Sequence, residues 1–276
     1  MNLEDLRAEI LQADKDIADA FSRRMEAVKN IADYKKDHGL PIVDEDQEQR
    51  VMENGQNLIE DDDLRGYFMP LLREAIETSK LWQRRLMDGQ RVAYCAGMSP
   101  EDYKIARQAF PDSTLVDYPN YKETYAAVEN GECDIAIVPF DKSYAGENGP
   151  VMDMLFDGSL YINQVINRTT SSDTIRYAVL SRVANRPEGS LDNCHVMMMF
   201  TVKDDPGSLS KAIHAISKYG YNMSIMRSRH VKNLPWNYYF IVEASGDDTT
   251  EEGQKMIKEL EAATTTLKVL GRYSVE

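Results

Sequence analysis

Residues 3–36 carry the longest uninterrupted helical pattern in the chain. Apolar side chains recur at spacings of three and four residues, at Leu3, Leu6, Ile10, Ala13, Ile17, Ala20, Phe21, Val28 and Ile31. This spacing is typical of a coiled-coil-like helix, which cannot bury its apolar stripe alone. The segment therefore needs helical partners, either in the same chain or in a second subunit.

Two further helices are predicted in the same part of the chain. The first runs from about Asp44 to Ile59 and the second from about Leu64 to Leu86, separated by an acidic break that suits a helix N-terminus. No strand pattern interrupts residues 1–88. We expect an all-helical domain there.

The pattern changes after Gly89 to an alternation of strands and helices. Strands are predicted over 91–95, 113–118, 133–138, 159–166 and 176–181, with helices over 100–110, 121–130 and 149–155. Such alternation predicts a single α/β lobe with a mainly parallel sheet over residues 90–183. A linker signal at 185–189 follows it.

The last segment, residues 193–276, has a different order. Strands are predicted over 195–202, 222–230, 236–245 and 267–273, and helices over 207–219 and 250–262. This order, βαββαβ, is the ferredoxin-like α+β arrangement.

Charge and cysteine content exclude several classes of function. A formal net charge of −14 argues against nucleic acid or an anionic membrane as the main partner. The acidic N-terminus lacks a signal-peptide pattern, and three cysteines without a CxxC fit buried thiols in a reducing cytoplasm. No metal or other cofactor is expected.

Several charged residues of the helical segment lie where an apolar stripe is expected. Arg24 lies between Ile17 and Ile31, Lys35 is three turns further on, and Arg7 borders the stripe. Unpaired charge is expensive to bury. These cations either pair internally with Asp44 and Glu48 or line a pocket for a small dicarboxylate that carries a hydroxyl group. The excess of cations, with Ser79 and Gln83 nearby, favours a pocket.

Residues 1–88 resemble the AroQ-type chorismate mutase domain, an intertwined helical dimer. The matching motif is Leu6-Arg7, Asp14, Arg23-Arg24, Lys35, Pro41-Ile42-Val43-Asp44, Glu48, Ser79 and Gln83. The resemblance implies that Arg24 and the partner subunit's Arg7 bind the two carboxylates of chorismate. It also implies that Lys35 and Gln83 donate to the ether oxygen. Asp44 and Glu48 would then hold the ring hydroxyl, and Ser79 would assist at a carboxylate. Where the family often has an arginine, this chain has Gln47.

The following segment resembles prephenate dehydratase, as in bifunctional chorismate mutase–prephenate dehydratases. The matching pieces are 91–94, 131–139, 141–146 and 175–177. The family has two lobes around its active site, but Arg91 to Val183 has room for one. The family motif Glu-Asn-Ser is Asp141-Lys142-Ser143 here, and Thr-Arg-Phe is Ile175-Arg176-Tyr177. We therefore expect dehydratase activity to be lost and the lobe to serve as a scaffold.

The last segment resembles an ACT domain, the amino-acid-sensing module of this family. The matching pieces are 205–209, 222–225, 227–230 and 235–240. The resemblance implies an effector site, with phenylalanine expected first and tyrosine second; a role in dimerisation alone is the alternative. The candidate effector residues are Gly207, Ser208, Leu209, Asn222, Arg227, Ser228 and Arg229.

Together these resemblances favour a homodimeric, cytoplasmic chorismate mutase of aromatic amino-acid biosynthesis, regulated through its ACT domain. Chorismate is the expected substrate and prephenate the expected product. Two alternatives stay open: a bifunctional enzyme with residual dehydratase activity, and a non-catalytic amino-acid sensor.

Overall fold

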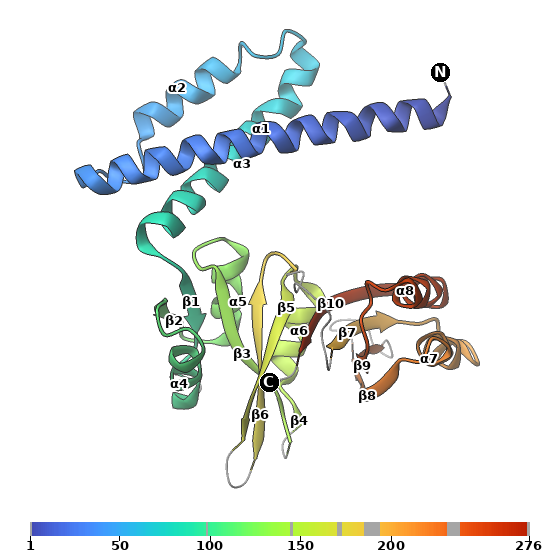
Figure 1. Cartoon of the computed structure of the whole chain (residues 1–276). Helices are drawn as coiled ribbons and strands as arrows, with labels where there is room; N and C mark the ends of the chain where they lie inside the picture. The colour runs from blue at the N-terminus through green and yellow to red at the C-terminus, as the bar shows by residue number, and fades with distance from the viewer. Residues whose placement is uncertain are drawn as a thin grey trace. The chain divides into compact units, whose positions relative to one another are not determined.

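The computed structural model describes residues 2–97, 99–143, 146–169, 173–184, 194–230 and 238–274. The predicted linker at 185–189 lies outside these residues, as do Tyr144, Ala145 and the segment 235–237 of the motifs quoted above. The chain divides into two compact units, Met1–Gln90 and Arg91–Glu276 (Figure 1). No helix among the described residues is long and apolar enough to cross a membrane.

The first unit is all helical within its described residues, as predicted. It consists of α1 (Leu3–His38), α2 (Glu45–Gly55) and α3 (Asp62–Asp88). The side chain of Asn2 caps the first turn of α1, and Gly39 ends the helix in the left-handed conformation, with φ of 64°. The predicted starts and ends of the three helices agree with these bounds to within a few residues.

Most of the apolar stripe of α1 remains exposed in the single chain. Along this helix only Val28 and Ala32 are buried, both in the half that packs on α3. The exposed stripe members are Leu3, Leu6, Ile10, Ile17, Phe21 and Ile31, each at least 44% exposed. Within one chain, therefore, α2 and α3 cover only part of the face that the sequence marks as buried.

The second unit begins with a mixed sheet and three helices. Its elements are β1 (Arg91–Tyr94), α4 (Pro100–Ala109), β2 (Thr114–Asp117), α5 (Tyr121–Glu129), β3 (Ile135–Lys142), β4 (Gly146–Glu147), α6 (Gly149–Asp157), β5 (Tyr161–Thr169) and β6 (Thr174–Ser181). The three predicted helices of this lobe are confirmed, whereas the two-residue strand β4 was not predicted from the sequence. The strand order is β2-β1-β3-β6-β5, with β4 on β3.

The expectation of a mainly parallel sheet is wrong. β1 pairs in parallel with β2 and β3, but β6 runs antiparallel to both β3 and β5. The cause is the connection between β5 and β6: the two strands pair as far as Thr169 and Thr174, so the chain reverses there without a crossover helix.

A four-stranded sheet completes the second unit. Its elements are β7 (Cys194–Thr201), α7 (Ser208–Lys218), β8 (Asn222–His230), β9 (Tyr238–Ser245), α8 (Glu251–Ala263) and β10 (Thr266–Ser274). The strand order is β10-β7-β9-β8 and every pair is antiparallel. The predicted βαββαβ order is confirmed for the part of the chain that the structure describes.

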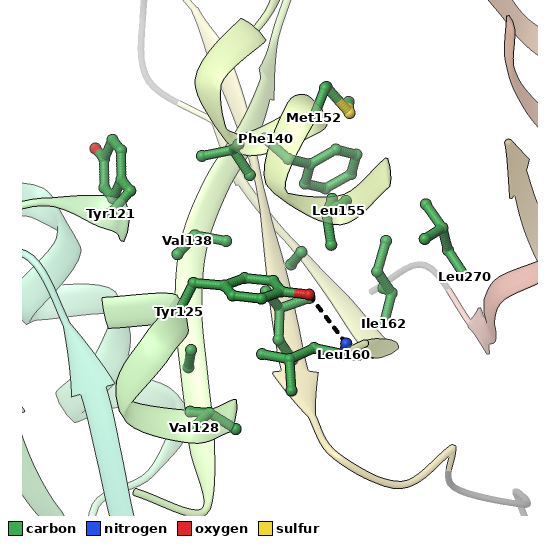
Figure 2. Packing of buried hydrophobic residues seen from close by; sticks show 14 of the residues in the cluster. Tyr121, Tyr125, Val128, Val138, Phe140, Met152, Leu155, Leu160, Ile162 and Leu270 are labelled. Carbon is green, nitrogen blue, oxygen red and sulfur yellow. Dashed lines mark hydrogen bonds between the residues drawn. The ribbon is translucent and has the colours of Figure 1, made fainter. Parts of the chain in front are cut away.

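The two sheets share one hydrophobic core. On one face of the four-stranded sheet, Val196, Met198 and Phe200 pack against α7 and α8. On the other face, Met197, Met199, Tyr239, Ile241 and Leu270 join the core of the lobe. Figure 2 shows Leu270 of β10 beside Ile162 of β5, and the backbone N–H of Leu160 donating a 2.9 Å hydrogen bond to the hydroxyl oxygen of Tyr125.

Candidate active site

The helical unit contains one pocket that brings together most of the predicted site residues. It has a volume of about 430 Å³. Its lining comes from all three helices and the α1–α2 loop: Arg24, Ala27, Val28, Ile31, Lys35, Ile42, Asp44, Gln47, Glu48, Val51, Ile76, Ser79, Lys80 and Gln83. Six predicted residues are therefore neighbours: Arg24, Lys35, Asp44, Glu48, Ser79 and Gln83. Arg24 and Ser79 are 55 positions apart in sequence and converge here because α1 packs on α3.

Arg24 is held in the pocket by neutral groups of α3. Its Nε donates to Ser79 Oγ at 3.1 Å, and its Nη2 donates to the carbonyl oxygen of Ala75 at 3.4 Å. Ser79 in turn donates to Ala75 at 2.6 Å and is 4% exposed. These bonds fix the guanidinium without neutralising its charge.

Lys35 reaches the pocket from the last turn of α1. Its Nζ donates to the carbonyl oxygen of Ile42 at 2.6 Å, which ties the end of α1 to the loop before α2. Among the described residues, neither Arg24 nor Lys35 has a carboxylate within ion-pair distance. The alternative in which these two cations form ion pairs with Asp44 and Glu48 is therefore wrong. Two uncompensated cations at one pocket suit an anionic ligand.

The acids of the pocket have partners of their own. Asp44 caps α2 by accepting from the backbone N–H of Gln47 at 3.0 Å. Glu48 Oε2 lies 3.1 Å from Lys80 Nζ. Gln83 is 7% exposed, and its Oε1 has no hydrogen-bond partner among the described residues. A buried amide oxygen in that condition is costly unless a ligand or water satisfies it.

Arg7 is the predicted catalytic residue that this pocket lacks. It lies exposed near the start of α1, seventeen residues before Arg24, which is about 25 Å along a helix. The pocket of one chain therefore contains no contribution from Arg7.

The motif residues of the α/β lobe are engaged by the four-stranded sheet. Arg176 donates to both carboxylate oxygens of Glu243 on β9, at 2.7 and 3.0 Å. Asp141 accepts two hydrogen bonds from Arg227 on β8, at 2.8 and 3.3 Å. Lys142 and Ile175 lie opposite each other on β3 and β6. Ser143 donates to Asp173 at 2.6 Å and accepts from the Thr174 N–H.

The seven candidate effector residues lie in two places. Gly207, in the left-handed conformation with φ of 86°, precedes Ser208 and Leu209 at the start of α7. The others are on β8, where Asn222 and Ser228 are exposed. Arg227 and Arg229 alternate with them and contact acids of the lobe: Arg229 lies 3.4 Å from Glu147 and 3.3 Å from Asp153. These two arginines therefore link the sheets within the unit.

Comparison with known proteins finds one family match in the helical unit and another in the α/β lobe. Residues 6–84 match the chorismate mutase type II family, and residues 102–182 match the prephenate dehydratase family. The chain therefore has a region similar to chorismate mutase type II followed by a region similar to prephenate dehydratase. Together the matches support the bifunctional chorismate mutase/prephenate dehydratase family.

Relatives and solved structures extend this similarity along the chain. The bifunctional chorismate mutase/prephenate dehydratase of Aquifex aeolicus is 22% identical over 367 residues, covering 98% of this chain and 97% of the relative. A prephenate dehydratase structure from Streptococcus mutans matches 67% of this chain and 98% of its own, with a TM-score of 0.61 and 24% identity. One from Arthrobacter aurescens, in complex with L-Phe, matches 67% of this chain and 89% of its own, with a TM-score of 0.56 and 14% identity.

Sequence reasoning missed two residues that the structure places at these sites. Lys80 lines the pocket of the helical unit and contacts Glu48, and Glu243 neutralises Arg176 of the α/β lobe. Lys80 could have been found from its place next to Ser79 and three residues before Gln83 on one helix. Glu243 follows the apolar run Phe240-Ile241-Val242 in its strand, and an acid in such a buried strand signals a cationic partner.

Proposed function

We propose that the helical region converts chorismate to prephenate. The observation that carries the proposal is the pocket in which Arg24 and Lys35 have no carboxylate partner among the described residues and lie beside the buried side-chain amide of Gln83. The match of residues 6–84 to chorismate mutase type II supports it independently. A dicarboxylate with an ether oxygen and a hydroxyl group complements these side chains.

The reaction is an intramolecular rearrangement in which the ether C–O bond breaks while a C–C bond forms between the enolpyruvyl arm and the ring. No proton or electron enters or leaves, so a nucleophile and a proton shuttle are unnecessary. Catalysis depends on holding the arm over the ring and on stabilising negative charge at the ether oxygen. Lys35 and Gln83 are the proposed donors to that oxygen, and Arg24 with Ser79 the proposed carboxylate site. Asp44 and Glu48 are proposed to accept from the ring hydroxyl.

The proposed active unit is a homodimer. The exposed apolar stripe of α1 needs a cover, and a second copy of the same helix supplies one of matching length and character. Arg7 lies too far along α1 to reach the pocket of its own chain. In the dimer, the partner subunit's Arg7 would supply the second carboxylate site.

We also propose that dehydratase activity is lost. Arg176 and Asp141, which lie in the altered motifs, are neutralised by Glu243 and Arg227 rather than free for a substrate. β5 and β6 are separated by four residues and pair with each other up to Thr169 and Thr174, and the Aquifex aeolicus alignment is 367 residues long against a chain of 276. The specific observation favouring the alternative, a bifunctional enzyme, is the match of residues 102–182 to prephenate dehydratase.

Another proposal concerns residues 193–276, which we assign to an ACT-type regulatory domain in a three-part chain (1–88, 90–183 and 193–276). The ferredoxin-like order of the sheet supports it, as does the L-Phe complex of the Arthrobacter aurescens dehydratase. Gly207, Ser208 and Leu209 are the proposed carboxylate site for phenylalanine, with tyrosine as the second candidate. Asn222 and Ser228 are exposed on β8 and stay candidates, whereas Arg227 and Arg229 are occupied by lobe acids. Dimerisation without a ligand is the alternative.

One assay tests these proposals together. The full chain is incubated with chorismate at neutral pH, with and without phenylalanine, and the products are separated by chromatography. Prephenate without phenylpyruvate is expected. Phenylpyruvate would establish the bifunctional enzyme instead, and no loss of chorismate would leave the non-catalytic sensor. A change of rate with phenylalanine is the expected sign of an effector site.

A further inference from the structure

We propose that Lys80 is a positioning residue of the mutase pocket, holding Glu48 in the orientation that receives the hydroxyl group of the substrate. The inference rests on the proposed mutase function. It adds to the pocket a residue that none of the motifs quoted above contains.

The geometry joins Lys80 to Glu48 across two helices. Lys80 Nζ on α3 lies 3.1 Å from Glu48 Oε2 on α2 and 2.7 Å from Glu77 Oε1 on its own helix. The side chains of Lys80 and Glu48 are 17% and 29% exposed, whereas that of Glu77 is 53% exposed. Burial opposes the charge on Lys80, but the hydrogen bonds to Glu77 and Glu48 outweigh it and raise the pKa of Lys80.

The other two cations of the pocket, Arg24 and Lys35, donate to neutral oxygens and not to Glu48. Arg24 is bonded to Ser79 and Ala75, and Lys35 to the carbonyl oxygen of Ile42. On α2, the residue before Glu48 is the neutral Gln47. In the part of the chain that the structure describes, Lys80 is therefore the cation within ion-pair distance of Glu48.

The contact leaves Glu48 able to work on a ligand. Lys80 binds Oε2, and no described residue donates to Oε1. One oxygen is thus anchored while the other can accept from a hydroxyl group in the pocket. Without the anchor, the long Glu48 side chain would lose its fixed rotamer and the carboxylate would face the pocket without compensation.

Kinetics of the full chain with chorismate test the role. Lys80→Met is expected to lower kcat about 10- to 100-fold, the size of effect that misplacement of a reacting group produces, with a smaller change in KM. Lys80→Arg, which keeps the charge, is expected to recover most of the activity. In a background of Glu48→Gln, Lys80→Met is expected to cost little more, because the group it positions is already gone.

Two variants separate positioning from a structural role. Glu77→Gln removes the other partner of Lys80 and leaves the contact with Glu48, so kcat is expected to stay within about twofold of the wild type. Lys29→Met is the matched control: it removes a lysine from an exposed pair on α1, so kcat is expected to stay close to the wild-type value. The inference is overturned if Lys80→Met keeps the wild-type kcat, if its cost adds fully to that of Glu48→Gln, or if Glu77→Gln loses as much activity. A wild-type chain without mutase activity would instead remove the proposed function itself.

Discussion

Arg176 and Glu243 form a two-point ion pair that joins the α/β lobe to the four-stranded sheet. The guanidinium Nη1 lies 2.7 Å from Oε2 of the carboxylate, and Nη2 lies 3.0 Å from Oε1. The side chains are 14% and 4% exposed, and the guanidinium also lies 5.0 Å from the centre of the Phe140 ring. A charge this deeply buried is strongly destabilising unless an opposite charge lies beside it. The stability of each sheet therefore depends on the other sheet supplying its member of the pair.

Removing one member of this pair should be costly. Glu243→Gln leaves Arg176 buried without its main counter-charge, which is expected to destabilise the second unit by about 3–5 kcal/mol. Urea unfolding, followed by hydrogen exchange of peptides from β6 and β9, reports this unit separately from the helices. The control is Glu251→Gln, which removes an exposed pair with Lys255 and is expected to cost less than about 1 kcal/mol. Equal shifts for the two variants would contradict the argument.

The proposed mutase function predicts how two substitutions in the pocket of the helical unit change activity. Lys35→Ala removes the proposed donor to the ether oxygen, so kcat is expected to fall at least about 100-fold, as when an oxyanion-stabilising group is lost. Arg24→Ala removes a ground-state carboxylate contact as well and is expected to impair both kcat and KM. Steady-state rates of chorismate loss measure both effects. Lys29→Ala, exposed on the same helix, serves as the control, and an active Lys35→Ala enzyme would refute the assigned role.

The pocket of the helical unit could be predicted from the sequence because charged residues interrupt the apolar periodicity of α1. Arg24 interrupts an otherwise apolar stripe, and such a departure is visible without knowledge of the fold. The structure brings Arg24 together with Lys35, Glu48 and Gln83 as expected. Lys80 was missed because its environment depends on how α2 packs on α3, and the sequence of α3 alone does not show which of its polar residues face α2.

In the α/β lobe, by contrast, the features that matter most could not be predicted from the sequence. Apart from β4, its strands were predicted closely, but their directions were not, since a hairpin and a crossover produce the same order of elements along the chain. The ion pairs of Asp141 with Arg227 and of Arg176 with Glu243 join positions far apart in sequence. Pairings of that kind follow from tertiary packing and leave no local pattern.

Complementation between two inactive variants tests whether Arg7 acts in the partner's pocket. Arg7→Ala and Lys35→Ala chains are unfolded together, mixed in equal amounts and refolded. Half of the dimers are then mixed, and each mixed dimer has one pocket with both residues intact. About a quarter of the wild-type activity is therefore expected, although either variant alone is inactive. No recovery in a mixture shown to contain mixed dimers would place Arg7 outside the pocket of the partner.

Asp102 is expected to make the free energy of unfolding of the α/β lobe depend on pH. The residue is fully buried and accepts hydrogen bonds from the hydroxyls of Tyr121 and Tyr177, each at 3.1 Å. Burial raises the pKa of Asp102 to about 6, against the opposing effect of these bonds. A carboxyl whose pKa is higher in the folded than in the unfolded state stabilises the fold fully below the unfolded pKa. That stabilisation is lost as the pH rises through about 6.

The free energy of unfolding of the second unit should therefore carry a contribution from Asp102 that falls by about 2–3 kcal/mol between pH 4 and pH 7. Asp102→Asn removes the titrating group and is expected to flatten this part of the curve. The measurement is the urea midpoint across that pH range, again read from hydrogen exchange of the lobe. Asp112→Asn, at an exposed position, controls for the amide substitution itself. If the curves of wild type and Asp102→Asn run parallel, Asp102 does not retain its proton in the folded lobe.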